Sequence, residues 1–285
     1  MQTKLHVQLL EHTPDPERLI AIAAKLCYAG CDINELAEKQ TPEVIDKFLD
    51  TLVNIGHESP MEHVSFTFAV EGVSRALTHQ LVRHRIASYS QVSQRYVKLN
   101  QFSYIIPPVI ENNETTKNIY IKKMEDDQKV YDELIDILCD EYAQQYIDST
   151  QYGKNNLQPT SIKPYEVLKI IASGNEVESK KVKNVVRSIE KKSIEDARYV
   201  FPNACETKII VTMNFRTLIN FIQHRACQRA QWEIRELAIE MIKLLKPVLP
   251  KLSLLLAPKC CTSKCPEGNL SCMKMAEQKA FFKNL

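Results

Sequence analysis

Two short arginine-bearing segments lie close together in the first third of the chain. Arg83-His84-Arg85 is followed, after seven residues, by Ser93-Gln94-Arg95. No acidic residue occurs between Glu71 and Glu111, so no carboxylate close in the sequence neutralises these arginines. A guanidinium group is a permanently charged planar fork that matches phosphate oxygens in pairs. The two segments therefore predict a pocket for a small anion with a hydrogen-bonding face, such as a phosphorylated nucleotide.

A solvated basic helix end is the alternative for Arg83-His84-Arg85, because arginine near a helix C-terminus complements the helix dipole without any further function. Two features favour a functional role. The following residues, 86–92, are not a solvated polar run, and the nearby sequence offers no acidic partner. Crowded arginines repel one another, and a bound anion relieves that repulsion.

A second polar set occurs later in the chain, at Asn214, Arg216, Asn220, His224, Arg225 and Arg229. Arg216 and Asn220 are four residues apart and share one face of a predicted helix. A helix start that carries asparagine and arginine is a candidate second anion site. A plain basic surface helix stays open for Arg229 and Arg235, which have Glu233 and Glu236 as possible partners. That alternative is weaker for Arg225, which lies among apolar residues.

Histidines and cysteines offer other chemistry. His57 and His63 are six residues apart with Pro60 between them, whereas the zinc-protease motif has two histidines four apart on a helix. A metal-dependent hydrolase built on His57, His63, His79 and His84 stays open only as an alternative. The nine cysteines are an odd number in a chain of ordinary size, which favours free thiols. A structural metal held by the tail cysteines stays open as the alternative to free thiols, and we expect no nucleophilic cysteine or serine.

Composition narrows the class of protein. The 285 residues carry a net charge of +2, which argues against a nucleic-acid-binding protein and favours a small anionic ligand. No apolar run reaches the roughly 20 residues that span a bilayer, and the N-terminus lacks a signal-peptide core. We therefore expect a cytoplasmic protein that does not bind membranes. The six glycines are too scattered for a glycine-rich phosphate loop.

Periodicity predicts an α+β fold, with an antiparallel or mixed sheet flanked by long helices. Helical patterns cover residues 14–55, 117–147 and about 217–246. Alternating apolar residues predict strands at 63–70 and 208–213. Another helix from Ser74 is expected to carry Gln80 and Arg83 on one face.

The predicted domain organisation is one domain over residues 1–258, followed by a cysteine-containing tail at 259–285. Residues 150–193 are rich in lysine and asparagine with little periodicity for part of their length, and they are predicted to form an insertion.

Arg-His-Arg, seven residues and then Ser-Gln-Arg is similar to the signature of the flavin-dependent thymidylate synthases. The chain also resembles this family at His57-Glu58-Ser59-Pro60, at Asn214-Phe215-Arg216 and between Arg225 and Glu233, in the family's order. The resemblance covers about residues 15–107 and 194–250. It implies reductive methylation of dUMP to dTMP in a homotetramer whose active sites are shared between subunits. FAD would be the cofactor, with methylenetetrahydrofolate as carbon donor and NADPH as reductant.

The resemblance also implies roles for individual residues. Those expected to bind dUMP are Gln80, Arg83, Gln91, Ser93, Gln94, Arg95, Arg198 and Arg225. Those expected to contact FAD are His57, Ser59, Arg83, His84, Arg85, Gln91, Asn214, Arg216 and Asn220. Arg225 would be the catalytic residue, because its fixed positive charge would favour ionisation of the uracil ring at N3 and raise electron density at C5.

Overall fold

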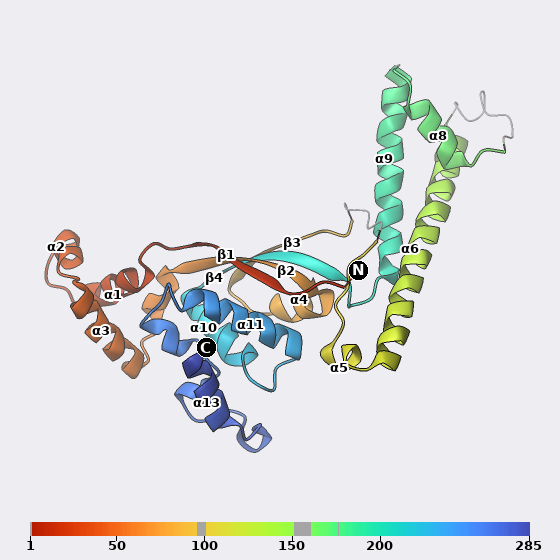
Figure 1. Cartoon of the computed structure of the whole chain (residues 1–285). Helices are drawn as coiled ribbons and strands as arrows, with labels where there is room; N and C mark the ends of the chain where they lie inside the picture. The colour runs from red at the N-terminus through yellow and green to blue at the C-terminus, as the bar shows by residue number, and fades with distance from the viewer. Residues whose placement is uncertain (1, 96–100, 151–160, 176) are drawn as a thin grey trace. The chain divides into compact units, whose positions relative to one another are not determined.

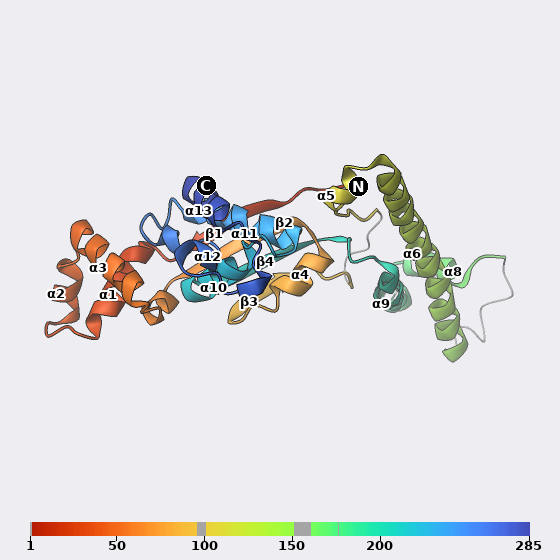
Figure 2. The same ribbon diagram turned by 90° about the horizontal axis from the view of Figure 1, so that it is seen from below.

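A computed structural model describes residues 2–95, 101–150, 161–175 and 177–285. The chain forms two compact units (Figures 1 and 2). The sheet unit comprises residues 4–91 and 207–285, and the helical unit comprises residues 1–3 and 92–206. The predicted single domain over 1–258 and its separate tail stay a prediction.

The sheet unit is built around four strands in the order β1-β2-β4-β3. The strands are β1 (His6–His12), β2 (Ser65–Ser74), β3 (Ala87–Gln91) and β4 (Glu206–Asn214). β1 pairs antiparallel with β2, and β3 pairs antiparallel with β4. This confirms the α+β class, and both predicted strands are present. β1 and β3 were not predicted. For β3 (Ala-Ser-Tyr-Ser-Gln) the reason is that the strand is short and nearly devoid of large apolar residues.

The helices of the sheet unit pack on the sheet or beside it. Those before β3 are α1 (Pro16–Leu26), α2 (Ile33–Glu38), α3 (Pro42–Ile55), the 3-10 helix η1 (Ser59–His63) and α4 (Arg75–Leu81). After β4 come α10 (Phe215–Arg225), α11 (Trp232–Leu245), η3 (Leu252–Leu255), α12 (Lys259–Thr262), η4 (Gly268–Leu270) and α13 (Met275–Asn284). α4 and α11 pack on the sheet, whereas α1, α2 and α3 lie beside it. The core combines alternate β2 residues, such as Phe66 and Phe68, with one face each of α10 and α11. Apolar alternation in β2 therefore fixes which face the helices cover.

The predicted helix over 217–246 is wrong in one respect, because it is two helices separated at residues 226–231. The side chain of Gln231 caps the second helix by accepting hydrogen bonds from the backbone N–H groups of Glu233 and Ile234, at 3.1 Å each. Such a cap satisfies donors that a continuous helix would have bonded internally. The break matters because Arg225 and Arg229 stand on either side of its start.

The helical unit contains α5 (Pro108–Glu111), α6 (Glu114–Ser149), α8 (Pro164–Ala172), α9 (Val177–Ala197) and η2 (Arg198–Val200). The prediction of a helix over 117–147 is confirmed. Residues 164–193 are largely helical, although the sequence showed little periodicity for part of this segment, and the insertion over 150–193 stays a prediction. Leu168 and Val182, from α8 and α9, are buried against the apolar face of α6. Residues 151–160 and 176 of that predicted insertion lie outside the described residues.

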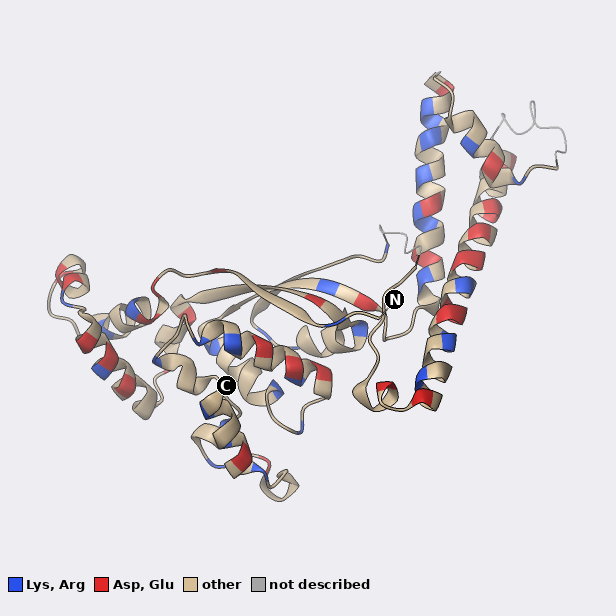
Figure 3. Ribbon diagram, in the orientation of Figure 1, with Lys and Arg blue, Asp and Glu red and all other residues tan. Residues whose placement is uncertain are grey.

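Charge is divided between the two long helices of the helical unit. Asp and Glu predominate along α6, whereas Lys and Arg gather along α9 (Figure 3). The two helices pack against each other through the apolar cluster that includes Ile135 and Val186. Opposite charge on neighbouring helices adds modest attraction to that packing. No helix in the described part of the chain is long and apolar enough to cross a membrane.

Candidate functional site

The Arg83-His84-Arg85 segment forms a turn between α4 and β3. α4 ends at Leu81, so the prediction that Gln80 and Arg83 share a helical face is wrong; Arg83 lies beyond the helix. The hydroxyl of Tyr89 on β3 donates to the carbonyl oxygens of Leu81 and His84, at 2.9 and 2.8 Å. Burial raises the pKa of Tyr89 to about 12, so this hydroxyl stays protonated and keeps donating. Tyr89 therefore ties the arginine-bearing turn to the sheet.

His84 and Arg225 are joined by a direct hydrogen bond, with Nε of Arg225 donating to Nε2 of His84 at 2.9 Å. The imidazole also packs edge-on against Phe221, with the ring centroids 5.0 Å apart. Burial, together with the positive charge of Arg225, lowers the pKa of His84 to about 4. His84 is therefore a neutral acceptor near pH 7, and it orients the guanidinium of Arg225.

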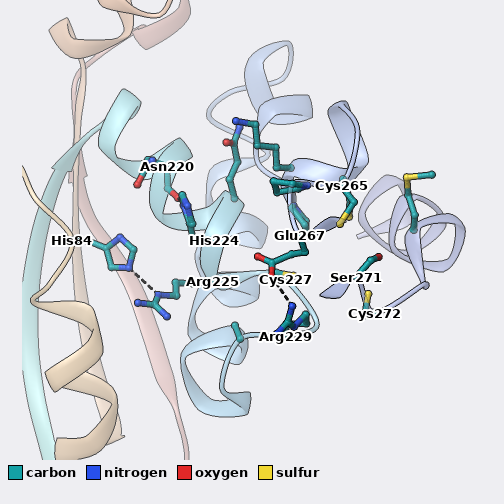
Figure 4. Close-up of a pocket in the computed structure, with 17 residues that line it drawn as sticks. His84, Asn220, His224, Arg225, Cys227, Arg229, Cys265, Glu267, Ser271 and Cys272 are labelled. Atoms are coloured by element: carbon teal, nitrogen blue, oxygen red, sulfur yellow. Dashed lines mark hydrogen bonds and ion pairs between the residues drawn. The ribbon is translucent and has the colours of Figure 1, made fainter. Parts of the chain in front are cut away.

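A pocket of about 480 Å³ lies beside this pair (Figure 4). His84, Asn220 and Arg225 form one side of it, and residues of the C-terminal tail form another. Burial lowers the pKa of Arg225, and the nearby charge of Arg83 acts in the same direction. Among the described residues, neither terminal nitrogen of Arg225 has a hydrogen-bond partner. The pocket thus offers a fixed positive charge and amide groups to a polar ring or an anion.

A second group of predicted residues surrounds η1. Ser59 Oγ lies 2.9 Å from His57 Nε2, and Arg216 pairs with Glu62 at 2.5 Å and with Glu58 at 3.4 Å. Both carboxylates raise the pKa of Arg216, and the largest cause is the hydrogen bond that Arg216 donates to Glu62. Arg216 therefore has two acidic partners, Glu58 and Glu62, which are distant in the sequence and were not predicted from it.

Two other predicted residues, Asn214 and Gln91, make hydrogen bonds within the fold. Asn214 caps α10 by accepting from the N–H of Thr217 at 2.9 Å. Gln91 Nε2 donates to Thr78 Oγ1 at 3.1 Å and to Thr207 Oγ1 at 3.2 Å. Gln80 is half-buried near the end of α4. Asn214 therefore fixes the start of α10, and Gln91 connects the end of β3 to α4 and β4.

The remaining predicted residues belong to the helical unit, where Glu195 links two of them. Arg95 Nη1 donates to the Glu195 carboxylate at 3.1 Å, and Arg198 Nε donates to the Glu195 carbonyl oxygen at 3.1 Å. The backbone N–H of Arg95 donates to Ser93 Oγ at 3.3 Å, and Gln94 Nε2 contacts the sulfur of Cys205 at 3.4 Å. Arg95 therefore has an acidic partner, which lies 100 residues away in the sequence rather than close by.

The possible pairing of Arg229 with Glu233 or Glu236 is also wrong. Arg229 pairs with Glu267 of the tail at 2.6 Å, while Glu233 is buried and accepts from the backbone N–H and the hydroxyl of Ser74. Tyr89, Glu195 and Glu267 were the contributors that sequence reasoning missed. Only Tyr89 left a local signal, as the one large side chain of β3.

Thiols and histidines do not form a metal centre in the described residues. All nine cysteines are free, and no three His, Cys, Asp or Glu side chains of the described ranges are grouped as metal ligands. Three half-buried thiols nevertheless line the pocket, at Cys227, Cys265 and Cys272. Burial raises the pKa of the neighbouring Cys261 thiol to about 12.

Residues 8–251 match the family described as thymidylate synthase complementing protein. A flavin-dependent thymidylate synthase of Clostridium tetani is 52% identical over 276 residues, which cover 97% of this chain and 96% of the relative. One from Geobacter sulfurreducens is 40% identical over 283 residues, covering 99% of both. The solved structure of the UMP/dUMP methylase PolB from Streptomyces cacaoi, bound with 5-Br dUMP, superposes with a TM-score of 0.60. It is 18% identical and covers 89% of this chain and 94% of that chain, so this likeness shows a common fold.

Proposed function

The chain belongs to the family of flavin-dependent thymidylate synthases, as its arginine motif predicts, and we propose that it converts dUMP to dTMP. Methylenetetrahydrofolate would supply the carbon and NADPH the reducing equivalents. The observation that carries this proposal is the pocket in which His84 and Asn220 accompany the half-buried Arg225. All three are residues at which the family resemblance implies flavin or nucleotide binding.

The residues present fit FAD. Arg83 and Arg85 are exposed, and in the described part of the chain neither has an acidic partner. Two such guanidinium groups match a pyrophosphate, and the amide of Asn220 at the pocket matches the polar edge of a ring. When bound, FAD supplies the hydride chemistry that a protein side chain lacks. His57, Ser59, Asn214 and Arg216 would complete the flavin contacts.

Arg225 is the residue to which we assign activation of the substrate. A positive charge held near N3 of uracil would favour the ionised ring, and the added electron density would make C5 a better nucleophile. His84 supports that role by accepting from Arg225 Nε while remaining neutral, because a protonated imidazole would repel the guanidinium. Neutral His84 therefore fixes Arg225 without weakening its charge.

The dUMP phosphate would be bound by Arg95 and Arg198. Both arginines donate hydrogen bonds to Glu195, which holds them close together in the helical unit. Gln80, Arg83, Gln91, Ser93 and Gln94 would complete the nucleotide contacts. No cysteine nucleophile is required, and the thiols at the pocket have no assigned step.

We also propose a homotetramer with active sites shared between subunits. Ile86 and Tyr199, which directly follow the site residues Arg85 and Arg198, are 83% and 82% exposed. Large apolar side chains beside a binding site are well suited to contact with a second subunit. Light scattering should then give a mass near four times the chain's 32.8 kDa.

The test of the reaction is anaerobic incubation with dUMP, methylenetetrahydrofolate and NADPH, with and without added FAD. We expect dTMP to form only when FAD is present. Folded protein that neither forms dTMP nor shows flavin absorption would contradict the proposal and leave only an anion-binding protein.

A further inference from the structure

The C-terminal tail lines the pocket opposite His84 and Arg225. Its contributions come from two short stretches, with Lys259 and Cys260 in α12 and Glu267, Ser271 and Cys272 around η4. Figure 4 shows Cys265, Glu267, Ser271 and Cys272 across the cavity from His84 and Asn220. The tail is therefore part of the cavity surface, although none of its residues entered the expected site.

The lining segment of the tail has little apolar anchorage of its own. None of residues 261–275, all of which the structure describes, is buried. Apolar anchors lie at the two ends of this segment: Cys260 is buried and Cys261 packs against the main core at its start, and Phe282 of α13 packs into the core beyond its end, where its carbonyl oxygen accepts from Lys246 Nζ at 3.1 Å. A segment with so few buried contacts depends on specific polar bonds for its position.

Arg229 supplies those bonds. Its Nη1 donates to the Glu267 carboxylate at 2.6 Å and to the Leu270 carbonyl oxygen at 2.5 Å, on the two sides of the η4 turn. Arg229 itself lies in the break between α10 and α11, four residues after Arg225. Two arginines of this short stretch thus have different tasks: Arg225 faces the pocket, and Arg229 holds the tail.

We propose that residues 259–275 form the outer wall of the ligand pocket and that Arg229 is the positioning residue that holds this wall. The wall adds Lys259, a cationic residue, and Ser271, a hydroxyl-bearing one, to the residues that line the pocket. These groups suit a ligand with anionic and hydrogen-bonding parts. That the ligand is FAD or dUMP rests on the proposed function, whereas the role of Arg229 in placing the wall does not.

Pocket thiols provide a readout of the wall that needs no activity. Cys227, Cys265 and Cys272 are half-buried at the pocket, while Cys27 is exposed in the segment between α1 and α2. Labelling by a thiol reagent, followed residue by residue by mass spectrometry, would report how open the wall is. Cys27 serves as an internal control within the same molecule.

The experiment compares wild type with Arg229→Ala and Glu267→Gln, and with Glu277→Gln as the matched control. Glu277 is an exposed tail residue that pairs with Lys274 at 3.8 Å and does not line the pocket. We expect labelling of Cys265 and Cys272 to rise about two- to fivefold in Glu267→Gln, which loses one charged bond. Arg229→Ala loses both hydrogen bonds, and labelling of Cys265 and Cys272 should rise about tenfold. Cys27 labelling and the control variant should stay at wild-type rates.

A charge-reversed double variant, Arg229→Glu with Glu267→Arg, should recover part of the protection. Release of bound FAD should accelerate in the same order as thiol labelling. If Cys265 and Cys272 were labelled in Arg229→Ala at the wild-type rate, the proposal that Arg229 holds the wall would be wrong. Wild-type protein that binds neither FAD nor dUMP would instead overturn the proposed function, with the thiol rates still deciding the role of Arg229.

Discussion

Arg225 donates through Nε to the neutral imidazole of His84, 2.9 Å away, and so connects the α10 C-terminus to the turn after α4. This bond orients the guanidinium while leaving its terminal nitrogens to the pocket. A histidine that is kept neutral by burial is suited to this task, because it accepts without adding a competing charge.

Replacing Arg225 with Ala should reduce dTMP turnover by about 10²–10³-fold while leaving bound FAD in place. The reason is that the proposed charge acts on the uracil ring, and the flavin contacts lie on other residues. Turnover and flavin absorbance measured on the same preparation check both parts. Gln228→Ala, an exposed neighbour, is the control, and unchanged dTMP formation in Arg225→Ala would remove Arg225 from its assigned role.

His84 should make the protein less stable as the pH falls. Its pKa is about 4 in the folded protein against 6.5 for the free side chain, so its contribution is complete above pH 6.5. Between pH 6.5 and 4 the unfolded chain takes up a proton that the folded chain does not, and stability falls. His84→Gln accepts from Arg225 without titrating. Between pH 7 and 5 the Tm of wild type should drop more than that of His84→Gln; equal drops would argue against a depressed pKa.

Arg95→Ala should weaken dUMP binding without unfolding the protein. The side chains of Arg95 and Glu195 are 45% and 36% exposed, and ion pairs near the surface contribute only about 0–1 kcal/mol to stability. A phosphate contact through arginine is worth more than that. Calorimetric titration with dUMP and a denaturant curve would separate the two effects. Arg187→Ala, an exposed arginine on α9, should bind dUMP normally; equal losses in both variants would point to a general charge effect.

Glu233 should be important for stability, although it lies outside the proposed active site. Its buried carboxylate accepts from Ser74 N at 2.6 Å and Ser74 Oγ at 2.5 Å, and Ser74 in turn caps α4. Glu233→Ala leaves buried donors without partners and should cost about 2–4 kcal/mol of unfolding free energy. Exposed Glu236→Ala should stay within about 0.5 kcal/mol, as measured by denaturant unfolding. A Glu233→Ala variant as stable as Glu236→Ala would show that the Ser74 bonds are dispensable.

The sequence predicted what local spacing encodes. Arg83-His84-Arg85 could be recognised because its residues are adjacent, and β2 because its buried residues alternate. The break between α10 and α11 was missed because it depends on a glutamine side chain that caps a helix, and glutamine is not a typical cap.

Long-range partners were beyond sequence reasoning. Glu195 lies 100 residues from Arg95, and Glu267 lies 38 residues from Arg229. Neither spacing has a period that a strand or helix would impose, so only the tertiary structure brings these charges together. The helical content of residues 164–193 was likewise hidden, because α9 carries many charges and buries only a narrow apolar stripe.

The pairing of β3 with β4 has a consequence for protein engineering. Gln91, at the end of β3, is paired with Ile209 of β4, and its side chain donates to Thr207. The last residue of β3 and the start of β4 therefore lie next to each other, although they are far apart in the sequence. The 115 residues from Val92 to Glu206 thus connect two strands that would otherwise form a simple β-hairpin. A tight turn of two to five residues is all that such a hairpin needs. The intervening helices could therefore be exchanged without changing the strand order of the sheet, provided that the proposed dUMP contacts Ser93, Gln94, Arg95 and Arg198 are kept.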